Sequence, residues 1–438
     1  MTQLRFYDTM RRTADPFEPL GEPVRMYSCG PTVYHDAHLG NLRTYVFVDM
    51  AKKVLRHTGL TVRHVMNITD VGHLVSDGDE GEDKMEVGAR REGLTAWDIA
   101  KRYEAGFIRQ CLALNIAAPD ILSRATAHIP QQIDMIATLE DKGLTYRTGD
   151  GIYFDTSKID DYGKLTGSSR EGFEAGARVD AGDKRNPTDF ALWKFSAEGE
   201  QRQMEWDSPW GTGFPGWHIE CSAMARQYLG DQIDIHTGGI DHIAIHHSNE
   251  IAQTECCTGK PFAHTWMHGA FLEATDGVKM AKSSGEFLTV FTLEERGIDP
   301  LAFRLLCFRT HYRKRMLFSW KHVEDAATAL RRLRLRIKTL NDEAEAVPPT
   351  SEAANRHIAR IEAALRDDLA MPQVMVELQT ILKSKALEPG EKLGLVARYD
   401  SLLGLELRRE IDGPLPTDLA KAAWEEATRA GGSDPVTL

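Results

Sequence analysis

A histidine, a glycine and an asparagine lie close together early in the chain, where they could bind a phosphate. His38, Gly40 and Asn41 lie in the segment GPTVYHDAHLGNLRTY, between a stretch that predicts a strand and one that predicts a helix. The first turn of a helix has free N–H groups that attract anions, Gly40 allows close approach of an adenine ring, and His38 can donate to a phosphate. The tetrapeptide is a weak signal alone, because the same residues also make an ordinary capping turn with an exposed histidine.

Two lysines three residues apart form a second candidate for phosphate chemistry. Lys279 and Lys282 lie in the segment KMAKSSGEFLTV, which follows a predicted strand. On a loop bounded by glycine, two such lysines can reach a triphosphate and neutralise the charge that develops as pyrophosphate leaves. An isolated lysine pair is more often a solvated loop. Its occurrence after the first segment, in the right order and on the same kind of sheet, favours a shared nucleotide site.

Four dispersed residues carry the side chains of a zinc site. Cys29 ends the first predicted strand, Cys221 lies at a helix start in PGWHIECSAM, and His246 and Glu250 are four residues apart in IHHSNEIAQ. That spacing puts His246 and Glu250 on one helix face. Two thiolates, an imidazole and a carboxylate are ligands that zinc accepts. The spacing is too wide for a zinc-finger pattern, so two buried cysteines and a solvated His–Glu pair remain the alternative from the residues alone.

The elements that must position these residues alternate between strand and helix. Segments 22–34, 43–57 and 61–69 predict strand, helix and strand, a βαβ unit that forms a parallel sheet. Ligands bind such sheets at the carboxyl ends of the strands. The pattern changes over 119–205, which includes a Gly- and charge-rich stretch and reads as an insertion, and sheet-type segments resume over 206–270.

After about residue 295 the apolar spacing is helical almost to the end, which predicts a helical bundle. Residues 308–338 carry a heavy excess of Arg and Lys in a chain whose net charge is −12. An acidic chain lacks the basic footprint of a general nucleic-acid binder. The basic run is therefore either a solvated helix face or a local surface for an RNA backbone.

Length and composition bound the class of protein. A chain of 438 residues is too long for one ordinary core, so two to four domains are expected. No stretch of about 18 apolar residues predicts a membrane span, and the polar N-terminus does not resemble a signal peptide. The six cysteines show no close pairing pattern, which argues against a disulfide framework. A cytoplasmic enzyme is the expectation.

The two phosphate segments resemble the HIGH and KMSKS signatures of class I aminoacyl-tRNA synthetases. Asn41 stands in place of the second histidine and keeps a donor amide, and Ala281 stands in place of a serine while both lysines remain. The blocks YSCGPTVYHDAHLGNLRTY, GWHIECSAM, DIHTGGIDH and HHSNEIAQ are similar to those of bacterial cysteinyl-tRNA synthetase, and the resemblance covers roughly residues 22–380. It implies an α/β fold in which a Rossmann-type catalytic domain with a parallel sheet and an insertion domain precedes an all-α helical bundle. The implied divisions are 1–118 and 206–270 for the two halves of the catalytic domain, 119–205 for the connective insertion, 271–320 for the lysine loop and a stem-contact region, and 321–438 for the bundle.

The resemblance also implies the roles of the site residues. One zinc ion per chain would be held by Cys29, Cys221, His246 and Glu250 and would bind the substrate thiol, since a hydrophobic pocket alone separates close analogues by only ~1–3 kcal/mol. ATP with Mg²⁺ and L-cysteine are the implied small substrates, and the acceptor arm of cysteine tRNA is the implied partner of a monomer. The implied residues are His38, Lys279 and Lys282 for catalysis, Gly40, Asn41, Gly238, Gly239, Asp241, Met280 and Ser283 for the nucleotide, and Thr69, Trp217 and His218 for the amino acid. A core aromatic at Trp217 and a plain tight turn at Gly238–Gly239 are the structural alternatives.

The C-terminal segment departs from the resembled family, which usually ends in a small anticodon-reading module. Here the chain reads PLPTDLAKAAWEEATRAGGSDPVTL, with a helix expected from about Pro416 to a break at Gly431, so the anticodon module is expected to be missing. Three functions follow: a cysteinyl-tRNA synthetase with a shortened C-terminus, a cysteine ligase that transfers the adenylate to a small amine as in mycothiol synthesis, or a non-catalytic binding protein. The text CGPTVYHDAHLGNLRTY favours the first over the second, whose motif typically reads CGITPYDxTHLGHA. The intact His38, lysines and zinc candidates argue against the third.

Overall fold

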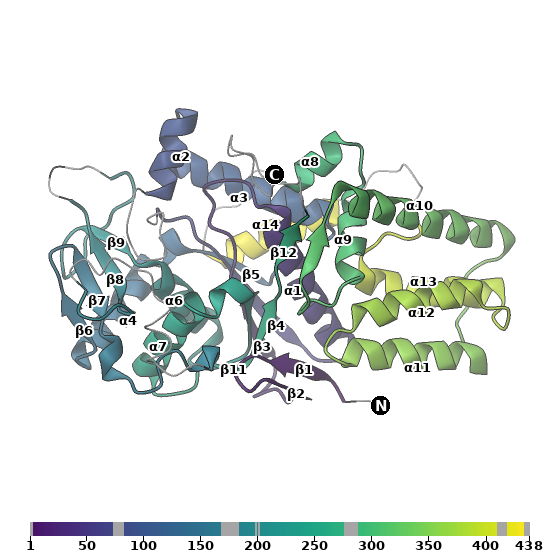
Figure 1. Cartoon of the computed structure of the whole chain (residues 1–438), viewed down its shortest axis with the longest axis horizontal. Coiled ribbons are helices and arrows are strands. Elements are labelled where there is room, and N and C mark those ends of the chain that lie inside the picture. The colour runs from purple at the N-terminus through teal and green to yellow at the C-terminus, as the bar shows by residue number, and fades with distance from the viewer. Residues whose placement is uncertain are drawn as a thin grey trace.

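A five-stranded parallel sheet forms the centre of the protein, which we describe from a computed structural model (Figure 1). The described residues are 3–72, 83–167, 184–197, 199, 202–275, 288–409 and 418–432. All four strand pairs in the sheet are parallel, and β3 lies in the middle. The strands run in the order β11 (Ala263–Gly269), β10 (Ile233–Gly239), β3 (Val24–Ser28), β4 (Val62–Ile68) and β5 (Ile121–Arg124). The predicted α/β class with a parallel sheet is confirmed.

Helices cover both faces of this sheet, and alternate strand residues face each side. Met26 and Met66 join the apolar cluster that includes α1 (Leu39–His57) and α3 (Ala96–Ala113). Their neighbours on the same strands, Tyr27 and Val65, point to the opposite face. They join the cluster on the side of α6 (Trp217–Leu229). Because side chains alternate along a strand, near-continuous apolar strands are buried by both helical layers.

The connective region carries a second, antiparallel sheet. Its strands run in the order β6 (Thr145–Arg147), β7 (Gly151–Phe154), β8 (Phe190–Phe195) and β9 (Gly213–Pro215), and α4 (Ile129–Asp141) packs beside α6. The segment expected as an insertion, 119–205, nevertheless begins with β5, the edge strand of the central sheet. The polypeptide therefore leaves the central sheet only after residue 124, where β5 ends.

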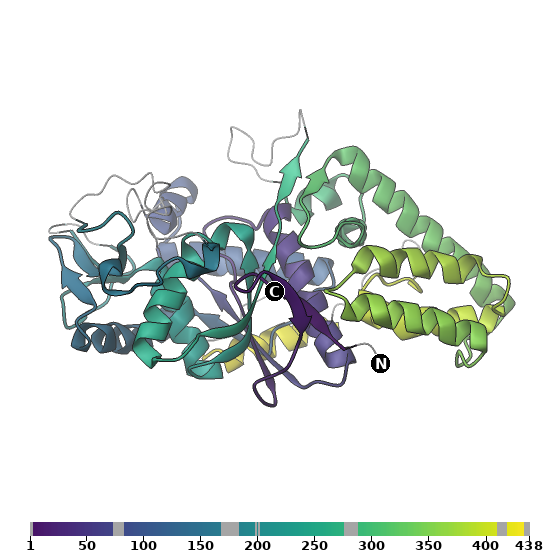
Figure 2. The same ribbon diagram turned by 60° about the horizontal axis from the view of Figure 1, so that its bottom comes forward.

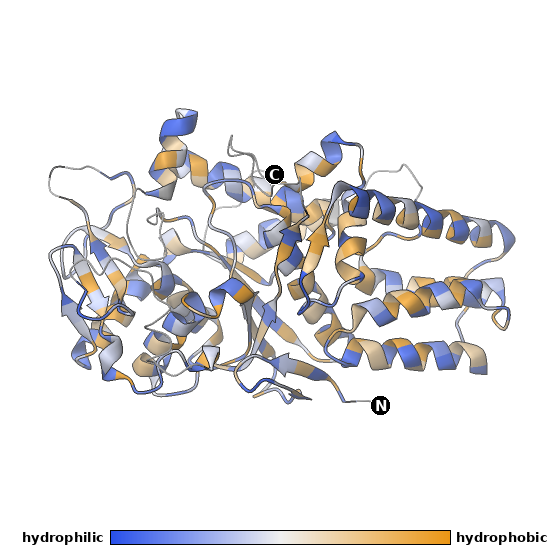
Figure 3. Ribbon diagram, viewed as in Figure 1, coloured by the Kyte–Doolittle hydropathy of each residue, from blue (hydrophilic) through white to orange (hydrophobic). Residues whose placement is uncertain are grey.

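The helices after residue 288 extend to one side of the sheet (Figures 1 and 2). In α10 the buried residues Val323, Leu330 and Ile337 recur at seven-residue steps, and Figure 3 shows the resulting apolar and polar stripes along these helices. These helices are α8 (Val290–Glu295), α9 (Pro300–Phe308), α10 (Trp320–Glu343), α11 (Glu352–Arg366), α12 (Met371–Lys383) and α13 (Pro389–Leu403).

The last described helix, α14 (Asp418–Ala430), packs against β5 and α3 of the catalytic domain instead of the bundle. Trp424 Nε1 donates to the carbonyl of Ile116 at 3.3 Å, and its ring meets Phe107 edge-on. The chain therefore returns to the central sheet after the bundle.

Short elements complete the described fold. The hairpin β1 (Arg5–Asp8) and β2 (Thr13–Pro16) lies beside β11, and β12 (Leu272–Ala274) pairs in parallel with β13 (Met316–Phe318). The remaining helices are α2 (Lys84–Glu92), α7 (His246–Thr258) and the single 3₁₀ turns η1 (Ala125–His128), η2 (Thr156–Lys158), η3 (Lys164–Thr166) and η4 (Ile240–His242). Among the described helices, none has the length and apolar character needed to cross a membrane.

Candidate active site and metal centre

A pocket of about 390 Å³ opens where the carboxyl ends of β3 and β10 meet the start of α1. This is the edge at which open parallel sheets bind ligands. Gly30 makes the close packing possible, because a Cβ there would lie 1.6 Å from the carbonyl oxygen of Asn67. The predicted site residues that line the pocket are Cys29, His38, Gly40, Asn41, Thr69, Trp217, Cys221, Gly239, Asp241 and His246.

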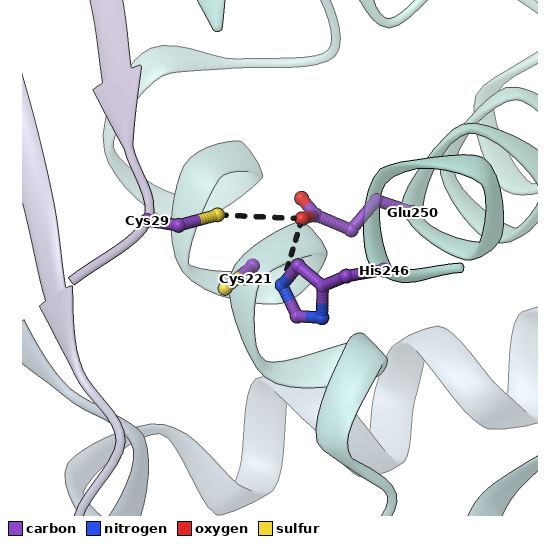
Figure 4. Close-up of side chains that lie close together, drawn as sticks. All are labelled: Cys29, Cys221, His246 and Glu250. Carbon is purple, nitrogen blue, oxygen red and sulfur yellow. Dashed lines mark hydrogen bonds and ion pairs between the residues drawn. The ribbon is translucent and has the colours of Figure 1, made fainter. Parts of the chain in front are cut away.

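One end of this pocket holds the four predicted metal ligands, the cluster drawn in Figure 4. Cys29 follows β3, Cys221 lies in the second turn of α6, and His246 and Glu250 are one turn apart in α7. One donor atom from each of the four lies within 4.8 Å of the other three, and all four residues are buried. Glu250 Oε1 lies 3.0 Å from His246 Nε2 and 3.6 Å from Cys29 Sγ. Three separate elements thus bring the four side chains together.

The titratable groups of this metal cluster shift one another's pKa values. The hydrogen bond with Cys29 lowers the pKa of Cys221 to about 7, whereas burial raises the pKa of Cys29. Burial disfavours the carboxylate of Glu250, but His236 and His246 outweigh burial and lower its pKa. Burial also disfavours an imidazolium at His246, but Glu250 and Cys221 outweigh it and raise the pKa of His246 to about 10. A proton on His246 therefore offsets the same negative charge that a bound metal ion would offset.

Further histidines surround the ligands. His236 Nε2 lies 2.9 Å from Glu250 Oε2, and His247 Nε2 lies 3.3 Å from Cys29 Sγ. Cys29, His236, His247 and Glu250 also form a second convergent set of donors. Cys29, Cys221 and His246 line the pocket while His236 and His247 do not, so the first set is the one that faces the pocket. The second set supports it, as outer residues do in metal sites.

The other end of the pocket is the first turn of α1. His38 caps this helix through Nδ1, which accepts from the Asn41 N–H at 3.2 Å, while Asn41 Oδ1 accepts from the His38 N–H at 3.3 Å. This reciprocal pair is a capping box. Burial and the neighbouring His35 lower the pKa of His38 to about 4. Nδ1 of His38 thus serves as an acceptor, and the lowered pKa favours the neutral ring.

Comparison with known proteins identifies the family. Residues 16–328 match the family described as "tRNA synthetases class I (C) catalytic domain". The chain is 54% identical over 407 residues to cysteine–tRNA ligase 1 of Burkholderia lata, covering 92% of this chain and 85% of that protein. It is 44% identical over 438 residues to cysteine–tRNA ligase of Zymomonas mobilis, covering 92% of this chain and 84% of that protein. The chain belongs to the cysteine–tRNA ligase family.

Solved structures of class I synthetases share its fold. Mycobacterium tuberculosis methionyl-tRNA synthetase bound by methionyl-adenylate superposes with a TM-score of 0.59 at 14% identity, covering 95% of this chain and 98% of that one. A LeuRS–tRNA–LeuAMS ternary complex from Agrobacterium radiobacter gives a TM-score of 0.61 at 12% identity, covering 97% and 87%. At such identities the likeness concerns the fold alone.

Within this cysteine–tRNA ligase fold, the other predicted residues take three kinds of position. Thr69 and Trp217 line the pocket beside the metal cluster, with Thr69 Oγ1 donating to Glu220 at 3.0 Å. His218 lies outside the pocket lining and contacts His246, Nδ1 to Nδ1, at 2.9 Å. Gly238 also lies outside the lining, and a Cβ there would meet the His247 and His242 rings at 2.7 and 2.8 Å. Lys279, Met280, Lys282 and Ser283 lie outside the described residues.

The sequence analysis singled out neither His236 nor His247. Both are completely buried against the metal cluster. The signal for His236 was its place in β10: a histidine inside a buried strand needs a polar partner. Its partner, Glu250, comes from α7, fourteen residues later.

Proposed function

We propose that this chain activates L-cysteine with ATP as cysteinyl-adenylate and transfers the cysteinyl group to the 3′ end of cysteine tRNA. One observation carries the proposal: Cys29, Cys221 and His246 of a buried Cys–Cys–His–Glu cluster line one pocket of about 390 Å³ together with the capped N-terminus of α1. Relatives that are 40–54% identical are cysteine–tRNA ligases, which supports the same activity here. The small-amine ligase is not favoured, and the buried ligand set argues against a non-catalytic binding protein.

The donor set fits one zinc ion per chain. Two thiols, one imidazole and one carboxylate match the ligand types and the number that zinc takes in proteins. Bound there, zinc would supply a soft Lewis acid for the substrate thiolate, which a hydroxyl or methyl group cannot replace. The protein's own part is to hold the ligands in place, with His236 and His218 fixing Glu250 and His246. Thr69 and Trp217 would enclose the amino acid beside this cluster.

The nucleotide would lie along the first turn of α1, with Mg²⁺ carried by its phosphates. His38 Nδ1 already accepts the Asn41 N–H, so Nε2 is the atom that can donate to a phosphate oxygen. The neutral ring then orients the phosphate, and positive charge must come from elsewhere. Lys279 and Lys282 are the residues proposed to supply it, with Met280 and Ser283 as neighbouring contacts. The cysteine carboxylate attacks the α-phosphorus, pyrophosphate leaves, and positioning with charge stabilisation accounts for catalysis.

The remaining parts of the proposal concern the rest of the chain. Gly238, Gly239 and Asp241 are proposed to border the ribose and adenine, with Gly238 acting by leaving space. The region 271–320 and the bundle from 321 are proposed to face the acceptor arm and stem of tRNA. We further propose a monomer that works in the cytoplasm, where its tRNA is found.

The deciding experiment is transfer of labelled cysteine to total bacterial tRNA, followed as acid-precipitable, base-labile product. Charging confined to cysteine tRNA, dependent on ATP and absent with serine, is the expected result. Cysteine-dependent ATP–pyrophosphate exchange without any tRNA charging would instead favour a ligase whose acceptor is a small amine. Absence of both reactions in zinc-loaded protein would refute activation itself.

A further inference from the structure

A groove of about 790 Å³ lies in the helical bundle between α10 and α12 (Figure 1). One stripe of each helix lines it, over residues 325–336 of α10 and 372–383 of α12. At a rise of about 1.5 Å per residue, each stripe is about 16 Å long, or about three helical turns. Leu305 and Arg309, at the end of α9, join the lining. This groove and the candidate active-site pocket share no lining residue.

Apolar side chains line part of this groove. Leu333 and Met375 are nearly buried, whereas Val376 is 65% exposed, the largest fraction among the exposed large apolar residues of the described ranges. A single exposed apolar side chain is ordinary on a protein surface. Val376 differs because it lies in a groove beside other apolar side chains, where one ligand could cover all of them. Such a channel between two helices is the kind of surface that receives an amphipathic helix.

Cations without partners border the same groove. Four of them line it, and within the described part of the chain none forms an ion pair or a side-chain hydrogen bond: Arg309, Arg332, Arg336 and Lys383. Asp325 is the one carboxylate among the described lining residues, and its Oδ2 already lies 3.2 Å from Nζ of Lys321, which is outside the lining. The groove is therefore positive in a chain whose net charge is −12. A complementary ligand must bring anionic groups to it.

We propose that this groove docks an acidic amphipathic helix of another protein. A helix laid between α10 and α12 would bury its apolar stripe, spaced i, i+3, i+4 and i+7, against Val376 and its apolar neighbours. Glutamates or aspartates beside that stripe would meet the four unpaired cations. An RNA backbone would also pair with the cations but would leave Val376 uncovered, so the helix fits both halves of the lining. The inference goes beyond the proposed function, and no step of the activation chemistry depends on it.

The test uses a synthetic peptide of about 15 residues that carries leucines on one helical stripe and glutamates on both sides of it. Binding of the labelled peptide to the full chain is followed by fluorescence anisotropy. Two comparison peptides have the same composition in scrambled order, or lysine in place of each glutamate. We expect the acidic amphipathic peptide to bind at least about tenfold more tightly than either, and added salt to weaken it. Absent binding, or equal binding of the acidic and the scrambled peptide, would overturn the proposal.

Apolar substitutions locate the bound peptide. Val376→Asp places a charge in the groove and should weaken the acidic peptide at least about tenfold, as loss of a buried anchor does. The matched control is Leu335→Asp on α10, because Leu335 is 44% exposed and lies outside the lining. Both positions are exposed, so the melting temperatures should stay close to that of the parent chain. Equal weakening by both variants would show that the peptide does not occupy the groove.

Charge reversal separates a protein partner from RNA. Arg332→Glu combined with Arg336→Glu should weaken the acidic peptide at least about tenfold. The control pair, Arg331→Glu with Lys338→Glu, makes the same charge change on exposed positions of α10 outside the lining and should have a much smaller effect at physiological salt. The KM for tRNA is measured for both double variants. A rise in this KM confined to the groove pair, in a chain that does not prefer the acidic peptide, would assign the groove to RNA and overturn the proposal.

Sedimentation of the parent chain and of Val376→Asp tests a second copy of this chain as the occupant. Dimers that Val376→Asp abolishes would assign the groove to that second copy and overturn the proposal, whereas the same sedimentation of both chains agrees with it. Because anisotropy requires no catalysis, a chain that binds the acidic peptide but fails to activate cysteine would refute the proposed function and leave the docking site standing.

Discussion

Two buried clusters in this chain each surround a carboxylate, and they balance its charge in different ways. The metal cluster is centred on Glu250, whose neighbours are two thiols and three histidines. The second, which we call the junction cluster, is centred on Asp49 of α1. Asp49 Oδ2 lies 2.6 Å from Arg304 Nη2 and 2.8 Å from Lys53 Nζ.

In the junction cluster, the chain's own cations balance the charge of the Asp49 carboxylate. Arg304 also donates to the carbonyl of Leu403 at 2.7 Å and to that of Leu114 at 3.0 Å, so it joins α9, α13 and the segment after α3. Burial disfavours the Asp49 carboxylate, but Lys53 and Arg304 outweigh burial and lower its pKa. Every charge here has its partner inside the protein.

The metal cluster lacks such a cation. Its donors converge on one point, and the groups that favour the Glu250 carboxylate are the imidazoles of His236 and His246. Under the proposed zinc assignment, the carboxylate of the junction cluster is matched by fixed cations of the chain, whereas that of the metal cluster is left for an ion.

The largest effect is expected at the metal cluster itself. Cys221→Ser removes a soft ligand, so zinc content and cysteine-dependent pyrophosphate exchange should fall together. Exchange should drop by on the order of a thousandfold, more than the 10–100-fold that loss of an outer partner costs. Metal analysis and exchange kinetics provide the measurements, with Cys256→Ser as the matched control outside the cluster. Full zinc and full selectivity over serine in Cys221→Ser would show that the ligand assignment is wrong.

At the junction cluster the effect should appear in stability. Arg304→Met leaves Asp49 buried with one cation fewer and should lower the free energy of unfolding by about 3 kcal/mol. Denaturant titration gives this value, and the exposed Arg331→Met is the control. Metal content should be unchanged, since the two clusters share no residue. A loss of zinc at normal stability would break the distinction.

The same variant has a predicted pH dependence. The folded pKa of Asp49 is depressed, so its pairing contributes stability above the unfolded pKa of ~3.9 and loses it as pH falls further. The difference between Arg304→Met and the parent chain should therefore be largest near neutral pH and should shrink below about pH 4. A difference that stays constant with pH would mean that the cost comes from lost packing.

These clusters also show what the sequence could and could not predict. Local patterns predicted α1, β3 and β4 closely, because each follows its own apolar period. They missed β5, since four residues give too short a pattern, and they could not show that α14 returns to the central sheet.

Side-chain convergence was harder to predict than secondary structure. Cys29 and Glu250 are more than two hundred residues apart, and only the family resemblance joined them before the fold did. No resemblance was drawn for Asp49 and Arg304, whose pairing depends on how the bundle meets α1. His236 was missed for the same reason, since a single strand histidine does not indicate which carboxylate it will meet.

A smaller effect is expected at His236, outside the ligand set. His236→Phe keeps a ring stacked on Trp266, with centroids now 4.6 Å apart, but removes the contact with Glu250. Zinc affinity, measured by competition with a chelator, should fall about tenfold. Cysteine selectivity should persist once zinc is restored. Unchanged affinity would mean that Glu250 is held well enough by α7 and His246 alone.

The smallest effect is expected at Lys53, the second cation of the junction cluster. Lys53 is partly exposed, with 17% of its side chain accessible, and Arg304 still pairs with Asp49 when it is removed. Lys53→Met should therefore cost about 1 kcal/mol of unfolding free energy, clearly less than Arg304→Met. Denaturant titration of both single variants and of the double variant measures this. If Lys53→Met cost as much as Arg304→Met, Asp49 would need both cations. The two clusters would then not differ in how fully the chain's own residues balance the buried carboxylate.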